Sequence, residues 1–137
     1  MFPITTKILV VDDFKTQRLN IEKKLRTLGF TGEIIDVPSA QQAMLRLNQA
    51  KSEGVPFNLV IADINMPDIT GLDLLKEVRA SAELKDTPLL MVTAESDPGI
   101  LSESVNLGVS QVLMKPFTID ELRDKMKAVW EKHNPSK

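Results

Sequence analysis

Residues 8–13 have the sequence ILVVDD, an unbroken run of four apolar residues followed at once by two acids. A short, β-branched and wholly apolar run is typical of a parallel strand that is covered on both faces. The same pattern, an apolar run that ends in a polar residue, returns at LVIAD (59–63), LLMVT (89–93) and VLMK (112–115). These stretches predict the buried strands of a parallel sheet, and residues 34–37 predict a weaker strand.

Segments with helical spacing separate these strands, so the chain reads as five βα units and its class as α/β. Ser39 and Thr118 each match the start of a capping box, and Pro98 fits the first turn of the fourth helix. The expected apolar helix faces are Phe14, Ile21, Leu25 and Leu28; Ala40, Ala43, Met44 and Leu47; Leu72, Leu75 and Val78; Leu101 and Val105; and Ile119, Leu122, Met126 and Val129. We also expect Met91 and Met114 to pack in the core.

The composition of the chain excludes several classes of function. The 137 residues fit a single domain, and 17 basic against 19 acidic residues argue against a nucleic-acid-binding surface. The chain has no cysteine and one histidine, His133, which excludes thiol catalysis and multi-histidine metal sites. No apolar run approaches the roughly 18 residues that span a bilayer, and no signal peptide is evident, so we expect a cytoplasmic protein without membrane attachment.

The polar residues that follow the strands are the candidate site. The carboxyl ends of parallel strands meet at one edge of the sheet, where ligands bind in α/β folds. We therefore expect three acids, a hydroxyl and an amine to converge there: Asp12, Asp13, Asp63, Thr93 and Lys115. Clustered carboxylates call for a cation, and oxygen ligands favour Mg²⁺. Thr93 and Lys115 would bind a phosphoryl group, with Asp63 as its nucleophilic acceptor.

Taken singly, these residues have simpler interpretations. Asp12 or Asp13 could cap a helix, and Asp63 could be a loop acid. Thr93 could be a turn hydroxyl and Lys115 a solvated lysine. Four of the five strand ends carry such groups, however, which favours a joint site. The basic residues near the N-terminus are interpreted as a solvated helix face, although they could steer an acidic partner: Lys7, Lys15, Arg18, Lys23, Lys24 and Arg26.

From about residue 7 to residue 130, the chain resembles the receiver domains of bacterial two-component response regulators. The motifs that carry the resemblance are the acidic pair Asp12-Asp13, Asp63 within IADINMPDITG (61–71), Thr93-Ala94 and Lys115-Pro116-Phe117. The resemblance implies a flavodoxin-like, doubly wound (βα)5 sheet with strand order 2-1-3-4-5. It also implies a cis peptide bond between Lys115 and Pro116.

The resemblance assigns roles at the site. Asp63 would accept a phosphoryl group from a sensor histidine kinase or a phosphotransfer domain. Mg²⁺ would be held by Asp13, Asp63 and the carbonyl of Asn65, and Asp12 would hold a metal-bound water. The phosphoryl oxygens would be bound by Thr93, Lys115 and the amide of Ala94. Asn65 and Glu95 would modulate self-dephosphorylation. The protein would act as a signalling switch rather than as an enzyme.

Within that family, the chain is most similar to single-domain chemotaxis regulators of the CheY type. These act when phosphorylation remodels the face of the fourth helix, fifth strand and fifth helix for a downstream target such as the flagellar-motor switch. These regulators usually have an aromatic residue three positions before the lysine, where this chain has Val112. The stretch 47–63 is also a few residues longer than in the CheY type. A phosphorelay intermediate or another stand-alone receiver therefore remains an alternative. Less favoured are a phosphorylation-independent interaction module and an aspartate-nucleophile phosphatase, in which an acid would replace Asn65.

Overall fold

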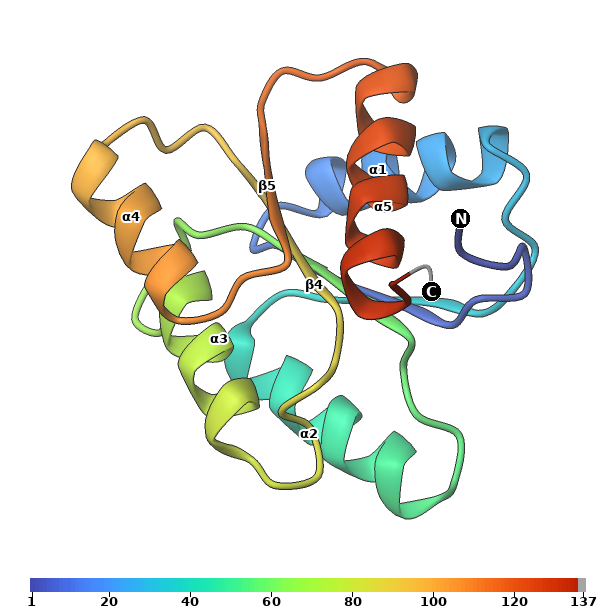
Figure 1. Ribbon diagram of the computed structural model, residues 1–137, viewed down its shortest axis with the longest axis horizontal. Helices are drawn as coiled ribbons and strands as arrows, with labels where there is room; N and C mark the ends of the chain where they lie inside the picture. Colours follow the sequence, from blue (N-terminus) through green and yellow to red (C-terminus); the bar gives the residue numbers. More distant parts are fainter. Residues whose placement is uncertain (136–137) are drawn as a thin grey trace.

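The computed structural model describes residues 1–135, in which strands and helices alternate along the chain (Figure 1). The strands are β1 (Ile8–Val11), β2 (Ile34–Val37), β3 (Leu59–Ala62), β4 (Leu89–Thr93) and β5 (Gln111–Met114). The helices are α1 (Lys15–Thr27), α2 (Ala40–Ser52), α3 (Gly71–Ala80), α4 (Pro98–Asn106) and α5 (Ile119–His133). Each predicted strand and helix is therefore present.

The five strands form one parallel sheet in the order β2-β1-β3-β4-β5, as predicted. Val11 pairs with Ala62, so the residues that follow them, Asp12 and Asp63, leave the sheet side by side. Thr93 pairs with Met114, which places Lys115 just beyond the end of β4. The register therefore brings the polar residues after β1, β3, β4 and β5 to the same edge of the sheet.

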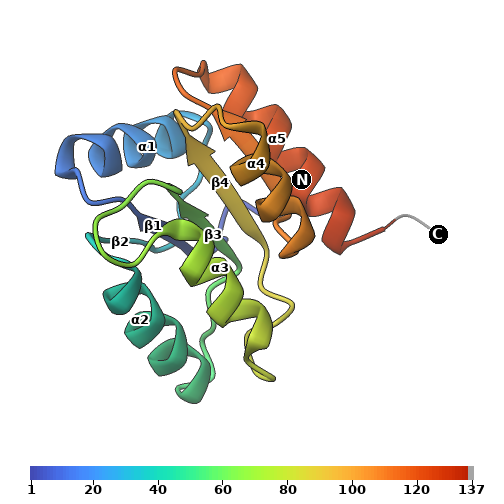
Figure 2. The same cartoon turned by 90° about the vertical axis from the view of Figure 1, so that its left-hand side faces the viewer.

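Two apolar layers flank the sheet, because successive side chains of a strand point to opposite faces. Leu9 and Val11 pack in the layer covered by α2, α3 and α4, whereas Ile8 and Val10 pack in the layer under α1 and α5. Figure 2 shows these helices on the two sides of the strands. The sheet centre is thus sealed on both faces, and its carboxyl edge is left for polar groups.

Helix ends agree with the predicted caps, with one difference. Thr118 forms a full capping box with Glu121, and Asp97 caps the α4 turn that Pro98 begins. Ser39 accepts a hydrogen bond from the Gln42 amide but receives no return bond. None of the described helices, within residues 1–135, has the length and apolar character that crossing a membrane requires.

Three predicted core residues are exposed instead. Phe14 (64% exposed) is the N-cap residue of α1 in extended conformation, so the helical spacing does not apply to it. Val105 is 66% exposed, because α4 buries Ser104 in its place. Met114, 40% exposed, is the last residue of β5, an edge strand that pairs on one side only.

Candidate functional site

The site begins with two acids at the ends of central strands. The amide of Asp63 donates to the carbonyl of Val11 at 3.0 Å, which extends the pairing of β1 and β3 by one residue. Asp12 is 1% exposed and Asp63 is 9% exposed. Two neighbouring, nearly buried carboxylates are costly unless a cation compensates their charge.

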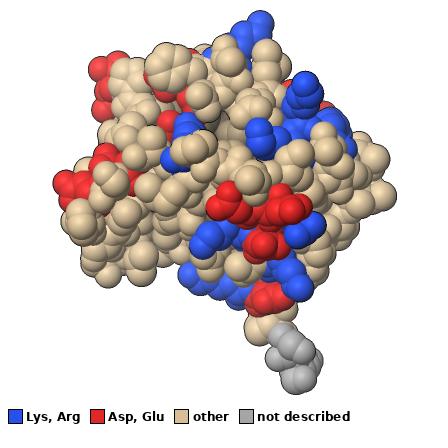
Figure 3. Space-filling model, turned by 90° about the horizontal axis from the view of Figure 1, so that it is seen from above, with Lys and Arg blue, Asp and Glu red and all other residues tan. Residues whose placement is uncertain are grey.

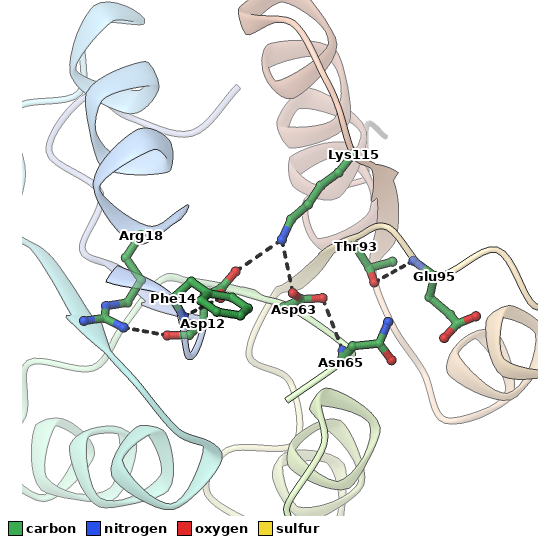
Figure 4. A network of polar contacts seen from close by, with 8 residues as sticks. All are labelled: Asp12, Phe14, Arg18, Asp63, Asn65, Thr93, Glu95 and Lys115. Atoms are coloured by element: carbon green, nitrogen blue, oxygen red, sulfur yellow. Dashed lines mark hydrogen bonds and ion pairs between the residues drawn. The ribbon is translucent and has the colours of Figure 1, made fainter. Parts of the chain in front are cut away.

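Lys115 is the cation that both carboxylates contact. Its Nζ lies 3.1 Å from Asp63 Oδ2 and 3.2 Å from Asp12 Oδ2 (Figure 4). The backbone of the lysine is held at this edge because its amide donates to the carbonyl of Thr93 at 2.8 Å. The peptide bond between Lys115 and Pro116 is cis, as predicted. The predicted convergence of Asp12, Asp63 and Lys115 is confirmed.

The environment of Asp12 favours its protonated form. Burial raises the pKa of Asp12 above its ordinary value, and this effect outweighs the opposing ones. The Phe14 amide, which donates to Asp12 Oδ1 at 2.9 Å, and the Lys115 ammonium both act to lower that pKa. Burial therefore disfavours the ionised form of Asp12, and a further cation nearby would offset that cost.

Asp63 sits at the start of a tightly folded loop. Its Oδ1 accepts from the Asn65 amide at 3.2 Å, which leaves Oδ2 toward Lys115. The loop turns back so closely that a Cβ on Gly71 would collide with the carbonyl of Asp63 and lie 2.8 Å from the Ile64 Cα. A residue without a side chain is needed at position 71, and the loop backbone consequently holds Asp63 in place.

Thr93 and Glu95 form the other side of the site. Thr93 is fully buried, and its Oγ1 accepts from the Glu95 amide at 3.0 Å. The Glu95 carboxylate points away from Asp63 and accepts from the Asp97 amide at 2.9 Å (Figure 4). Ala94 and Asn65 are exposed at the same edge. The hydroxyl of Thr93 is thus engaged in the β4–α4 loop through the Glu95 amide.

Asp13 provides the test of whether a metal ion fits. Its Oδ1 is buried and has no hydrogen-bond partner, a condition that costs free energy unless something else compensates it. Asp12, Asp13, Asp63 and the Asn65 carbonyl offer only oxygen donors, which suit a hard cation such as Mg²⁺. Within the described residues, no three acid side chains lie close enough together to form a metal site by themselves.

Arg18 was missed as a contributor. It was grouped with a solvated basic face, yet it is only 9% exposed and bonds the Asp12 carbonyl at 2.7 Å and the Asp36 carboxylate at 2.8 Å. Its spacing from Ile21 and Leu25, three and seven residues, places it on the buried face of α1. Through Asp36, which lies within β2, the second strand also supports the site.

Charge over the rest of the surface is mixed. The face seen in Figure 3 carries acidic and basic side chains next to one another, without one uniform basic area. Part of this mixture lies on α5, where Arg123 pairs with Asp120 at 3.3 Å and with Asp124 at 3.5 Å. On this face, charges of the two signs are therefore interspersed.

The chain is similar to known proteins in both its sequence and its structure. The family model of the response regulator receiver domain matches residues 8–127. Chemotaxis protein CheY of Pseudomonas aeruginosa is 40% identical over 128 residues, covering 93% of this chain and 98% of that protein. Chemotaxis protein CheY-3 of Vibrio cholerae is 39% identical over 126 residues, 92% of each chain. The solved structure of Vibrio cholerae CheY4 has a TM-score of 0.78 at 30% identity, covering 91% of this chain and 98% of that one.

Proposed function

Because this chain belongs to the family of response regulator receiver domains and is of the CheY type, we propose that it is a signalling switch controlled by phosphorylation of Asp63. The observation that carries the proposal is the position of Lys115, 3.1 Å from Asp63 and 3.2 Å from Asp12. The ammonium lies where it can bind an oxygen of a phosphoryl group on Asp63, and the net negative charge of the two carboxylates would be offset by a divalent cation.

The chemistry is phosphoryl transfer from a histidine. An Asp63 carboxylate oxygen attacks phosphorus, the new O–P bond forms, and the N–P bond of the donor phosphohistidine breaks with release of the imidazole. Lys115 neutralises charge on the transferred group, since its ammonium already lies beside the acceptor. Bound Mg²⁺ would offset the repulsion between the acceptor carboxylate and the donor. Asp12, Asp13, Asp63 and the Asn65 carbonyl would hold it.

The switch would work through competition for Thr93. In this structure the Thr93 hydroxyl accepts from the Glu95 amide, so the β4–α4 loop depends on it. A phosphoryl group on Asp63 would recruit that hydroxyl together with Lys115 and the Ala94 amide. The loop would then rearrange, shifting the population of the α4–β5–α5 face toward a form that a downstream protein binds. Asn65 and Glu95 flank the acceptor loop and would set how fast water removes the phosphoryl group.

Chemotaxis is the proposed pathway, because the relatives that match over almost the whole chain are named chemotaxis proteins. The partners would be a sensor histidine kinase upstream and a motor-switch type of target downstream. Val112 favours an alternative, since the chain has no tyrosine that could act as a rotating aromatic on β5. A phosphorelay intermediate would bind a phosphotransfer domain in a phosphorylation-dependent way, and a pull-down with each partner class separates the two pathways.

The direct test uses acetyl phosphate as a small-molecule donor. With Mg²⁺, intact-mass spectrometry should show one added phosphoryl group on the wild type and none on Asp63→Asn. Asp68→Asn serves as a matched control, because Asp68 is an exposed acid in the same loop. Equal labelling of the wild type and Asp63→Asn would contradict the assignment of the acceptor.

A further inference from the structure

Arg18 is a nearly buried cation that is fixed at both ends of its guanidinium. Its Nη1 donates to the Asp12 carbonyl at 2.7 Å, and its Nε donates to Asp36 Oδ1 at 2.8 Å (Figure 4 shows the first contact). Both distances are short and one partner is charged, so these are strong hydrogen bonds. The side chain therefore ties the β1–α1 turn to strand β2.

The carbonyl that Arg18 binds belongs to the peptide that joins Asp12 to Asp13. A peptide unit is planar, so fixing its carbonyl also fixes its amide and limits the direction in which the Asp13 side chain leaves the backbone. On the other side of Asp12, the amide donates to the Val37 carbonyl at 3.2 Å. The backbone of the acidic pair is thus held on both sides by contacts that involve β2.

Asp13 depends on this backbone more than Asp12 does. Asp12 has its carboxylate oriented by the Phe14 amide and by Lys115. Asp13 Oδ1, by contrast, is buried without any hydrogen-bond partner. With no such contact to orient that oxygen, its direction follows from the peptide that Arg18 holds.

We propose that Arg18, anchored by Asp36, is a positioning residue that aims the Asp13 carboxylate into the Mg²⁺ site. The inference rests on the proposed function of that site and adds a residue to it. Arg18 contacts the carbonyl of Asp12 and not a site carboxylate, and its guanidinium is paired with Asp36. Its effect on the metal is consequently geometric and acts through the backbone.

The test is the Mg²⁺ affinity of Arg18→Met, measured by titration calorimetry and by the Mg²⁺ dependence of labelling with acetyl phosphate. Loss of a group that orients a metal ligand typically weakens metal binding about 10- to 100-fold, and we expect about 10-fold because Arg18 acts indirectly. At saturating Mg²⁺ the labelling rate should return to within about twofold of the wild type, since Arg18 touches no reacting group.

Arg79→Met is the matched control. Arg79 also donates to backbone carbonyls, those of Gly108 at 2.9 Å, Lys85 at 2.9 Å and Thr87 at 2.7 Å. These carbonyls precede β4 and β5, at the edge of the sheet opposite the site. Arg79→Met should lower the melting temperature without changing the Mg²⁺ affinity, so a general loss of stability is distinguished from a loss of positioning.

Conservative variants keep the test decisive if Arg18→Met folds poorly. Arg18→Lys retains one donor, and Asp36→Asn retains a neutral acceptor, so both should bind Mg²⁺ with an affinity between those of the wild type and Arg18→Met. If Arg18→Met and Arg18→Lys bind Mg²⁺ like the wild type, the inference fails while the proposed function stands. If the wild type itself does not bind Mg²⁺, both fail.

Discussion

Replacing Lys115 by methionine should destabilise the fold and make its stability depend on Mg²⁺. The substitution keeps the length and apolar stem of the side chain but removes the ammonium that contacts Asp63 and Asp12 at 3.1 and 3.2 Å. Two carboxylates with 11% and 1% exposed side chains would then face each other without a cation. The expected consequence is a loss of folding free energy that a divalent ion reverses.

The size of this loss follows from the geometry. Each contact corresponds to about 5 kcal/mol of attraction at an effective dielectric constant of about 20, most of which is offset by desolvation of the charges. Removing one partner of a buried pair typically costs about 3–5 kcal/mol. The Lys115 side chain is 17% exposed, so we reduce the expected loss to about 2 kcal/mol at neutral pH.

Urea unfolding followed by circular dichroism, with EDTA or with Mg²⁺, measures the effect. Mg²⁺ should stabilise Lys115→Met more than the wild type, because in the variant it is the cation that reaches the acids. The loss should also shrink as the pH falls, since protonation removes the uncompensated charge on Asp12, whose pKa is already raised by burial. Lys7→Met is the control, because the Lys7 ammonium contacts the exposed Glu33, the Val55 carbonyl and the Phe57 ring, all outside the site. Equal stability of Lys115→Met and the wild type in EDTA would refute the reasoning.

Three further substitutions, one of them with a matched control, test separate parts of the structure. Gly71→Ala should cost at least about 2 kcal/mol and slow labelling of Asp63, because its Cβ would collide with the backbone after β3. Gly54→Ala meets no atom within 4 Å and should cost only about 1 kcal/mol for its φ of +77°; equal urea midpoints and labelling rates for the two would contradict this. Thr118→Ala should cost about 1 kcal/mol by urea unfolding through loss of the α5 cap, and an unchanged midpoint would contradict it. The pKa of His133 is lowered in the folded protein, mainly by burial and further by nearby cations. The unfolded chain therefore binds a proton more readily at this residue, and folding stability should be lost as the pH falls below about 6.5. Melting curves of His133→Gln should lack this component, and a parallel decline in both proteins would exclude His133 as its source.

The sheet could be predicted because four of the five strands are apolar runs with a polar residue directly after them. In a parallel sheet that residue must emerge at the carboxyl edge, so the meeting of Asp12, Asp63 and Lys115 follows once the strands are recognised. The strand order and the cis Lys115–Pro116 bond came from the family resemblance and are confirmed.

Other features depend on packing that no local pattern reveals. Met114 belongs to an apolar run that predicts a strand. Its exposure follows from its place at the end of the edge strand β5, which the run does not reveal. Arg18 shares the buried face of α1, and two partners outside the helix, the Asp36 carboxylate and the Asp12 carbonyl, explain how a cation can be buried there. Thr93 was expected beside the phosphoryl site, and its hydrogen bond to the Glu95 amide shows that it also supports the β4–α4 loop.

Chemical identification of the phosphorylated residue tests the central claim most directly. After incubation with acetyl phosphate and Mg²⁺, borohydride reduces an aspartyl phosphate to homoserine, and peptide mass spectrometry locates the change. The expected result is homoserine at position 63 alone. Homoserine at position 12 or 13, or a stable phosphoryl group on a hydroxyl such as that of Thr93, would contradict the assignment of Asp63 as the acceptor.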